Sequence, residues 1–466
     1  MNSDTICAIS TAPGVGGIAV ARVSGADAIS IVDKVWRGRP LAAATTHTAH
    51  LGDILDTDGS ILDQALATVM RAPGTYTGED TVEISVHGSL YVQRRLIEVL
   101  VAAGARLADP GEYTRRAFAA GHLDLAQAEA IADLIASQSK AAHDLAVNQM
   151  RGGISQQLDR LRAELVDLDA LLELELDFSE EDVEFASRIR LSDTIALVIS
   201  HIRSLHDSFA TGNAIRNGFT VAIAGATNAG KSSLLNALVG DDRAIVSDIH
   251  GTTRDIIEDT IVIGAYTFRL QDTAGIRSRD EADTIEAIGI QRATDALTRA
   301  DIALVLCPID GDRDTRSRAV DIVKTRLAAD HGKYTLLIIS KSDKTDKDAA
   351  QLAALRAALP CDIEAIEVSA HTGEGIDILR ARLQRHAEQS IERAPDIMIS
   401  NLRQQQALGI ALDAAERVRD TLATGATLDL AAFALRDCID ALAAVTGRIS
   451  SQEVLNTIFS RFCIGK

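Results

Sequence analysis

The feature that most constrains the fold of this chain is a glycine-containing loop between an apolar run and a helix-forming run. Residues 225–233 read GATNAGKSS; they follow the strand-like segment 219–224 and precede the helix-like segment 234–238. Such glycines let successive backbone N–H groups turn toward phosphate oxygens, and the start of the following helix adds positive potential. This order predicts a phosphate-binding loop in which Lys231 reaches the β and γ phosphates and Ser232 binds Mg²⁺.

A second segment predicts the base of the nucleotide. Residues 340–343 read SKSD and close the apolar run 335–339, at the edge where an open α/β sheet binds ligands. The Asp343 carboxylate can accept hydrogen bonds from both N1–H and N2–H₂ of guanine, a donor pair that adenine lacks. We therefore expect a guanine nucleotide.

Two further segments complete the nucleotide pattern. Residues 272–275 read DTAG after the strand-like 267–270, which suits a carboxylate near the metal and a glycine N–H at the γ phosphate. Residues 369–371 read SAH and follow the apolar residues 366–368, in the position of a loop that packs behind the nucleotide base. In order and spacing, the four segments resemble the translation-factor-like GTPases.

Length and composition limit the other possibilities. A chain of 466 residues exceeds one hydrophobic core, so two or three domains are expected. A net charge of −19 argues against a protein that grips nucleic acid over a wide basic face, and an RNA substrate would need a local patch or a basic partner. The five cysteines lack metal spacing, which suggests a reducing compartment. With no signal peptide and no apolar run of about 18 residues, we expect a cytoplasmic protein without a membrane partner.

Hydrophobic periodicity predicts three kinds of structure along the chain. Up to about residue 118 the pattern is strand-rich, with alternation in 17–24 and 81–86 and a helix over 90–103. From about Asp124 the spacing is helical through Leu176, and helix resumes from about Asn401. Neither helical half would cover its apolar stripe alone, so the halves should pack together.

The predicted fold class is therefore α/β plus α. A Ras-like P-loop GTPase domain is inserted in an all-helical domain and is preceded by an α+β N-terminal domain. The expected boundaries are 1–120 for the N-terminal domain, 121–216 and 384–466 for the two helical parts, and 217–383 for the GTPase domain.

Motifs outside the nucleotide pattern resemble one family over essentially the whole chain. The last five residues read FCIGK, and the other motifs are GED at 78–80, PGEYT at 110–114, LDLAQAEA at 123–130 and GTTRD at 251–255. These are similar to the MnmE (TrmE) family of tRNA-modification GTPases, and ordinary GTPases do not share the CIGK ending. The resemblance implies that an aminomethyl or carboxymethylaminomethyl group is added at C5 of the wobble uridine, position 34, of certain tRNAs.

The resemblance also implies partners and cofactors. The family forms a homodimer through the N-terminal domain and works in a heterotetramer with a second protein, MnmG (GidA), which binds FAD and NADH. A one-carbon folate, 5-formyltetrahydrofolate or methylenetetrahydrofolate, binds the N-terminal domain. By position its contacts would be Arg22, Glu79, His122 and Lys466. The alternative for Arg22 and Glu79 is a purely structural role, in which they form an ion pair at the edge of a strand.

For hydrolysis, the resemblance implies a monovalent cation. The residue after the DTAG segment is Ile276 rather than a glutamine that could orient water. In the family K⁺ lies between the phosphates, and the matching positions are Asn228, Ser247, the Ile249 carbonyl and Thr252. Thr253 would join Ser232 on Mg²⁺. We expect faster turnover in K⁺ than in Na⁺.

Two candidate catalytic residues follow from the same resemblance. Glu286 matches the glutamate that holds the attacking water, although an exposed acid at a helix start is the alternative. Cys463 would act as a nucleophile near the folate, or it is an inert cysteine near the C-terminus. The complete expected set of GTP-binding residues is Asn228, Ala229, Gly230, Lys231, Ser232, Ser233, Ser247, Asp248, Ile249, His250, Gly251, Thr252, Thr253, Asp272, Thr273, Ala274, Gly275, Ser340, Lys341, Asp343, Ser369 and Ala370.

Four positions depart from the family pattern. Ser340 stands where asparagine is usual, so a contact to guanine is shortened or lost, and specificity should rest chiefly on Asp343. His122 and His371 replace common lysines, and Thr227 replaces a proline. A second hypothesis remains open, in which the chain is a regulatory GTPase switch that binds ribosomes or another assembly without modifying a substrate. Tight, saturable binding of 5-formyltetrahydrofolate would separate the two.

Overall fold

The computed structural model describes residues 4–177, 188–240, 258–272, 295–329, 333–344, 349–360, 363–424, 428–449, 452–460, 462 and 464–465. Two compact units divide the chain. The first comprises Met1–Ala132, Met150–Ala170 and Leu435–Lys466, and the second comprises Asp133–Gln149 and Leu171–Ala434. The helices α4 (Leu125–Ala136), α6 (Gly153–Asp177) and α15 (Leu428–Thr446) each contribute several residues to both units.

The first unit contains a seven-stranded sheet in the order β3-β4-β5-β6-β2-β1-β7. All neighbours are antiparallel except β1 and β7. The strands are β1 Ile6–Ile9, β2 Ile18–Ser24, β3 Trp36–Gly38, β4 Thr48–Leu55, β5 Ile61–Met70, β6 Thr81–His87 and β7 Arg106–Leu107. The strands predicted from alternation and the helix predicted over 90–103 are confirmed, because β2, β6 and α2 (Leu90–Ala103) occupy those segments.

Two helices pack side by side on one face of this sheet. They are α1 (Ala28–Val35), which is followed by the short 3₁₀ turn Leu41–Ala43, and α2. Their apolar residues join the inward side chains of the strands in one buried core, which includes Trp36, the only tryptophan of the chain. The Trp36 ring lies so close to Gly52 on the neighbouring strand that a Cβ there would be 2.4 Å from it. Gly52 is thus required by the approach of the indole.

The C-terminal part of the chain packs on helices of the first unit. α16 (Gln452–Phe459) contacts α3 (Glu112–Ala119), and the ring of Phe459 lies near those of Phe118 and Phe462. At the tail, the Ser10 hydroxyl donates to the Gly465 carbonyl over 3.0 Å. Residues that are far apart in sequence therefore share this unit.

The second unit contains a six-stranded sheet in the order β13-β12-β11-β8-β10-β9. It is parallel except for the β9–β10 pair. The strands are β8 Phe219–Gly225, β9 Glu258–Ile263, β10 Tyr266–Asp272, β11 Ile302–Pro308, β12 Tyr334–Ser340 and β13 Glu364–Val368. The apolar runs predicted as strands before the DTAG, SKSD and SAH segments are confirmed as β10, β12 and β13.

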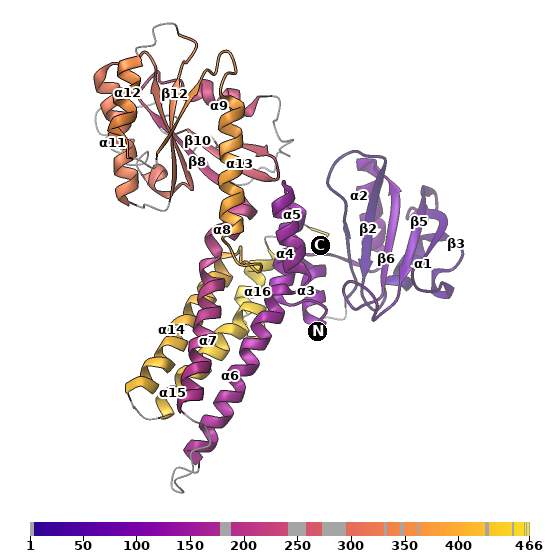
Figure 1. The fold of residues 1–466 in the computed structure, drawn as a ribbon. Helices are drawn as coiled ribbons and strands as arrows, with labels where there is room; N and C mark the ends of the chain where they lie inside the picture. Colours follow the sequence, from indigo (N-terminus) through magenta and orange to yellow (C-terminus); the bar gives the residue numbers. More distant parts are fainter. Residues whose placement is uncertain are drawn as a thin grey trace, which may run out of the picture. The chain divides into compact units, whose positions relative to one another are not determined.

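Helices cover both faces of this sheet, as Figure 1 shows. α9 (Lys231–Val239) and α13 (Ile376–Glu392) pack on one face, and α11 (Arg313–Ala329) and α12 (Ala349–Ala358) pack on the other. Successive residues of β11 alternate between the two cores, as a strand buried on both sides requires: Leu304 and Leu306 face one, Val305 and Cys307 the other. α13 extends past the expected boundary at 383, since Ala387 is still buried in the sheet's core.

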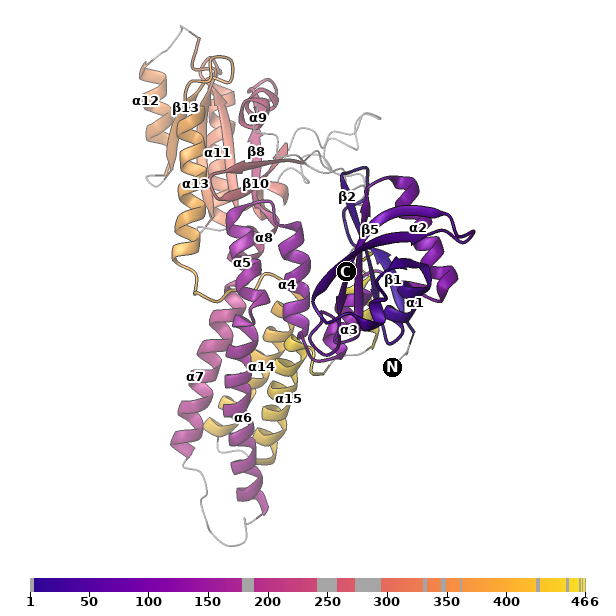
Figure 2. The ribbon, with the colours of Figure 1, turned by 90° about the vertical axis from the view of Figure 1, so that its right-hand side faces the viewer.

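Further helices in the described part of the second unit precede or follow the sheet in sequence. They are α5 (Lys140–Met150), α7 (Arg188–Asp207), α8 (Phe209–Asn217) and α14 (Leu402–Thr424). α7 and α14 run side by side (Figure 1 and Figure 2), and the apolar residues along both helices are buried. The helix predicted to resume near Asn401 begins at Leu402. No helix in the described part of the chain is long and apolar enough to cross a membrane.

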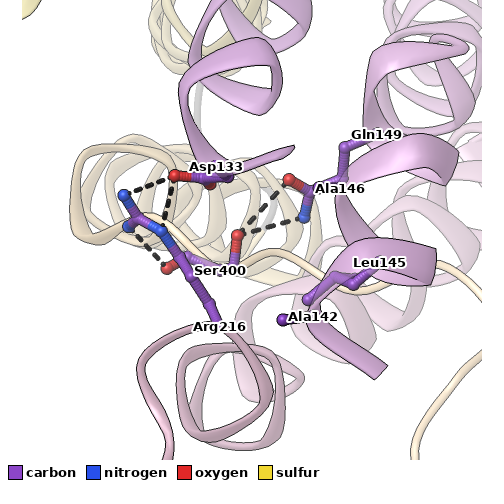
Figure 3. A pocket seen from close by; sticks show the side chains of 7 residues that line it. All are labelled: Asp133, Ala142, Leu145, Ala146, Gln149, Arg216 and Ser400. Carbon is purple, nitrogen blue, oxygen red and sulfur yellow. Dashed lines mark hydrogen bonds and ion pairs between the residues drawn. The ribbon is translucent and has the colours of Figure 1, made fainter. Parts of the chain in front are cut away.

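A polar junction connects the segments where the chain enters and leaves the six-stranded sheet (Figure 3). Arg216, near the end of α8, binds Asp133 through Nε at 2.8 Å and Nη2 at 2.7 Å, and its Nη1 donates to the Ser400 carbonyl over 3.4 Å. Gln149 donates to the Met398 carbonyl over 2.9 Å and to the Ser400 hydroxyl over 3.2 Å. These polar residues line a small pocket with Ala142, Leu145 and Ala146.

Candidate nucleotide-binding site

The loop after β8 has the backbone that phosphate binding needs. Asn228 and Gly230 have φ values of +63° and +93°, and Gly225 has +153°. A Cβ at Gly225 would also lie 2.7 Å from the Leu306 carbonyl oxygen of the neighbouring strand, so only glycine fits. Positive φ values turn successive peptide groups and give the loop an anion-binding concavity at the start of α9.

Lys231 is held over this loop. Its side chain is buried, and Nζ donates to the carbonyl oxygens of Gly225 and Ala226 over 2.8 and 2.9 Å. Ser232 and Ser233 follow in the first turn of α9. The ammonium group and the helix start therefore concentrate positive charge at the same point.

The segments expected to bind the base lie at the same edge of the sheet. The Ser369 hydroxyl, just after β13, donates to Asp343 Oδ1 over 2.7 Å, and the Ser342 backbone N–H donates to the Val368 carbonyl over 3.3 Å. The Ser369 hydrogen bond lowers the pKa of the Asp343 carboxyl below its ordinary value. Asp343 is exposed, so its carboxylate is ionised and accessible to a ligand.

Ser340 joins the base segment to the phosphate loop. It ends β12, it is buried, and its hydroxyl donates to the Ala229 carbonyl oxygen over 2.6 Å. Lys341 follows with a φ of +61°, and Ala370 follows Ser369 after β13. The structure thus brings together the expected residues of the phosphate loop, of 340–343 and of 369–370.

Asp310 was missed by sequence reasoning. It follows β11 at the same sheet edge, accepts a hydrogen bond from Lys344 Nζ, and lies 3.9 Å from Lys341 Nζ. The Lys344 hydrogen bond lowers the pKa of the Asp310 carboxyl. Its position directly after an apolar run was the available signal.

Other expected site residues are placed only in part. Asp272 is the last residue of β10, beside β8. The following residues lie outside the described part of the chain: Ser247, Asp248, Ile249, His250, Gly251, Thr252, Thr253, Thr273, Ala274, Gly275, Glu286, Cys463 and Lys466.

Three expected folate contacts lie in the first unit. Arg22 is on β2, Glu79 is in the loop before β6, and His122 follows α3; a Cβ at Gly78 would be 3.3 Å from His122 Nε2. The alternative of an Arg22–Glu79 ion pair is wrong. Arg22 pairs instead with Glu83 on the neighbouring strand at 2.8 Å, because the two residues are cross-strand partners in the register of β2 and β6.

Arg116 of α3, which sequence reasoning missed, binds Glu79. Its Nη1 lies 3.0 Å from Glu79 Oε2, and its Nη2 lies 3.0 Å from both Asp4 Oδ1 and Glu112 Oε1. Ser24 also donates to Glu79 over 3.1 Å. These partners fix the Glu79 carboxylate beside β2.

Three cysteines in the described part of the chain are free and buried. Burial raises the pKa of the Cys7 and Cys307 thiols to about 11 and that of Cys438 to about 12. At neutral pH they are protonated and poor nucleophiles.

The sheet order, the loop at the end of β8 and the acidic residue after β12 define a P-loop nucleotide-binding protein of the GTPase class. Family models agree: one described as the MnmE helical domain matches residues 125–463, and one described as the GTP-binding protein TrmE N-terminus matches residues 5–122. The chain belongs to the tRNA modification GTPase MnmE family.

Curated relatives match over all or nearly all of their length. Proteins named tRNA modification GTPase MnmE are 46% identical in Porphyromonas gingivalis, over 100% of this chain and 98% of the relative, and 44% identical in Parabacteroides distasonis, over 99% and 100%. The Bacteroides thetaiotaomicron relative is 45% identical over 100% of both chains. Among solved structures, the G domain of the T. maritima FeoB iron transporter is 26% identical and covers 36% of this chain and 98% of its own, with a TM-score of 0.27.

Proposed function

We propose that this chain is a K⁺-stimulated GTPase that works with an FAD-dependent partner protein in the cytoplasm. Together they add a carboxymethylaminomethyl or aminomethyl group to C5 of the wobble uridine, position 34, of certain tRNAs. As a member of its family, the chain is a GTP hydrolase that acts in tRNA modification. The observation that carries the nucleotide part is the meeting of the Lys231 loop and Asp343 at one sheet edge.

The chemistry follows from the charges at this edge. The loop N–H groups, the α9 N-terminus and Lys231 would bind the phosphates, and Asp343 would accept from N1–H and N2–H₂ of guanine. The Ser232 hydroxyl and the Asn228 side-chain oxygen are hard donors that suit Mg²⁺ and K⁺, with Thr253, Ser247, Ile249 and Thr252 as the further proposed ligands. The cations would supply positive charge against the β and γ oxygens, where negative charge develops as water displaces GDP from the γ phosphate.

A folate site in the N-terminal unit is the second part of the proposal. Arg22, Glu79, His122 and Lys466 would hold the one-carbon folate. The support is that Arg116 and Ser24 fix the Glu79 carboxylate, which suits an acceptor for the N–H groups of a pterin. Cys463 would lie close to this site.

A homodimer through the N-terminal domain is the third part. Leu51 and Leu66 are cross-strand partners on β4 and β5, and both are exposed, as is Ile61. Apolar side chains gathered on one exposed sheet face favour association. The domain limits 1–120, 121–216, 217–383 and 384–466 and the heterotetramer with an MnmG-type partner belong to the same proposal.

The cation requirement is tested by GTP hydrolysis at equal ionic strength. Turnover should be at least about tenfold faster in K⁺ than in Na⁺, because only a cation of the right size completes the charge at the phosphates. Glu286→Gln should lower kcat in K⁺ without weakening GDP binding. Equal rates in the two salts would remove the K⁺ part of the proposal.

The modification itself is tested by mass spectrometry of wobble nucleosides from cells that lack this protein. The 5-substituted uridines should disappear and return with the intact gene. An unchanged nucleoside profile, together with no saturable binding of 5-formyltetrahydrofolate, would favour the regulatory switch instead.

A further inference from the structure

We propose that Tyr76 is a ligand-binding residue of the first unit, and that its ring stacks on the planar part of a pterin. This role rests on the proposed folate site, whose expected contacts include no tyrosine, phenylalanine or tryptophan. Tyr76 lies in the loop before β6, three residues before Glu79, and it is 36% exposed. A planar heteroaromatic ring is the class of ligand that such a side chain recognises.

The loop that carries Tyr76 is folded by its own threonines. Thr75 and Thr77 are buried. The Thr75 hydroxyl donates to the Glu79 carbonyl over 2.7 Å, and the Glu79 backbone N–H donates to Thr77 Oγ1 over 3.3 Å. Thr77 also shares a hydrogen bond of 2.7 Å with Ser24 of β2. Because both chain neighbours of Tyr76 are turned inward, its own ring is left at the surface of the first unit.

The Tyr76 ring is fixed although it is exposed. Its hydroxyl shares a hydrogen bond of 2.9 Å with Thr114 of α3, which is fully buried. Burial raises the pKa of the Tyr76 phenol above its ordinary value, so the phenol stays neutral at pH 7. A ring that is already anchored loses little freedom when a ligand binds, and more of the contact energy therefore appears as affinity.

Arg22 lies over the same ring. Its Cζ is 5.7 Å from the ring centroid of Tyr76 and 5.5 Å from that of the buried Tyr113, and both distances suit a cation–π contact. Nε and Nη2 of Arg22 lie 2.9 and 2.8 Å from Glu83 Oε1, which fixes the guanidinium. The cation thus covers one side of the Tyr76 ring and leaves the exposed part for a ligand.

This ring is on the sheet face that α1 and α2 leave open. Both chain neighbours of Arg22 on β2 are buried in the core beneath these helices. Side chains alternate along a strand, so Arg22 and the Tyr76 ring lie on the opposite face, as does Ser24, which donates to Glu79. An aromatic ring, a cation and a carboxylate are therefore gathered together. They suit the flat pyrimidinone half of a pterin, with its N–H donors and its carbonyl.

Calorimetric titration of the full-length protein with 5-formyltetrahydrofolate tests this role. Tyr76→Leu should weaken binding about tenfold, because a stacked ring is lost. Tyr76→Phe keeps the ring and should weaken binding by less than about threefold. Tyr91→Leu is the matched control and should leave the affinity unchanged, since Tyr91 is also exposed but belongs to α2 on the other face of the sheet. Circular dichroism and GDP affinity control for folding of each variant.

A double-mutant cycle separates ligand contact from mere support of Arg22. In an Arg22→Gln protein, Tyr76→Leu should still weaken binding about tenfold, because the ring touches the ligand directly. A loss that disappears in the Arg22→Gln protein would overturn the contact and make Tyr76 a support for the guanidinium alone.

The outcomes also separate this role from the function on which it rests. Unchanged affinity in Tyr76→Leu, or an equal loss in Tyr76→Phe, would overturn the role of the Tyr76 ring and leave the folate site standing. Failure of the unaltered chain to bind 5-formyltetrahydrofolate saturably would overturn the proposed folate site and this role with it.

Discussion

Glu112 is a buried carboxylate whose charge depends on its neighbours. It is 2% exposed and accepts hydrogen bonds from Arg106 at 2.7 Å, from Arg116 at 3.0 Å and from the Asp109 backbone N–H at 2.8 Å. Burial alone would raise its pKa, but these donors outweigh it, and the pKa of Glu112 lies below the ordinary 4.5. The Glu112 carboxylate is therefore ionised in the folded first unit at neutral pH.

Replacing Glu112 by glutamine should destabilise this unit by about 3 kcal/mol at pH 7, because two guanidinium groups lose their buried partner. Because the pKa of Glu112 is lower in the folded state than in the unfolded state, its ionised carboxylate stabilises the fold at pH values above the unfolded-state pKa. The difference in stability between the two proteins should therefore persist above pH 4.5 and shrink as the pH falls further. Urea unfolding at several pH values measures it. The exposed Glu98, which pairs with Arg95 on α2, is the control, and Glu98→Gln should cost less than about 1 kcal/mol.

Lys231→Ala should lower the GTP hydrolysis rate by at least about 100-fold, since a fixed positive charge at the phosphates is lost. Lys333→Ala is a matched control. Lys333 also caps backbone carbonyls, those of Thr298 and Arg299, but it precedes β12 and so lies at the opposite end of that strand. A comparable loss of kcat in both variants would contradict the assignment of Lys231.

Single residues show where sequence reasoning stops. The positions of the phosphate loop could be predicted because local order and glycine geometry determine them. The partners of Arg22, Glu79 and Ser340 could not, because each partner comes from a distant segment: Glu83 across a strand pair, Arg116 from α3 and Ala229 from another strand's loop. Side-chain pairing depends on sheet register and packing, which spacing along the chain does not encode.

At the scale of elements, the strands of both sheets were readable because they are buried on one or both faces and so carry period-two or continuous apolar patterns. Helix ends were less readable. α13 continues to Glu392 because Ala387 still contacts the sheet's core, and no residue near 383 stops a helix. The sheet order itself needed the structure, since β11 separates β12 from β8.

The junction around Arg216 links several elements of the second unit. Besides Arg216, the backbone N–H of Ala141 in α5 donates to the Ala265 carbonyl in the β9–β10 turn over 3.0 Å. The Ile399 N–H donates to the Ser208 hydroxyl over 3.1 Å. A movement of the β9–β10 pair would therefore act on α5 and, through the junction, on the two segments where the chain enters and leaves the six-stranded sheet.

Arg216→Ala should loosen this junction by about 1–2 kcal/mol, less than a fully buried pair, because Arg216 is 33% exposed while Asp133 is 9% exposed. Amide hydrogen exchange should accelerate at residues 398–401 and in α8. The α7–α14 pair Arg203–Glu416 serves as a control, since both side chains are more exposed. Unchanged amide exchange at residues 398–401 would show that the Arg216–Asp133 ion pair does not stabilise this segment.

On the scale of the whole molecule, the nucleotide site lies in one unit and the expected folate contacts Arg22, Glu79 and His122 in the other. A ligand that binds only the folded part of a protein stabilises that part by RT ln(1 + [L]/Kd), which is about 2.7 kcal/mol when the free ligand is at a hundredfold excess over Kd. GDP should therefore raise the unfolding temperature of one calorimetric transition, and 5-formyltetrahydrofolate that of another. A single transition that both ligands shift equally would contradict this separation.

The indole that fills the space above Gly52 offers a way to watch one part of this protein alone. Trp36 is the sole tryptophan and is buried in the N-terminal core, so the intrinsic fluorescence excited near the red edge of protein absorption originates there. A red shift of the Trp36 emission would report the opening of the seven-stranded sheet, whether or not the six-stranded sheet of the second unit is folded. The chain therefore carries a built-in optical reporter for the folate half of its proposed chemistry.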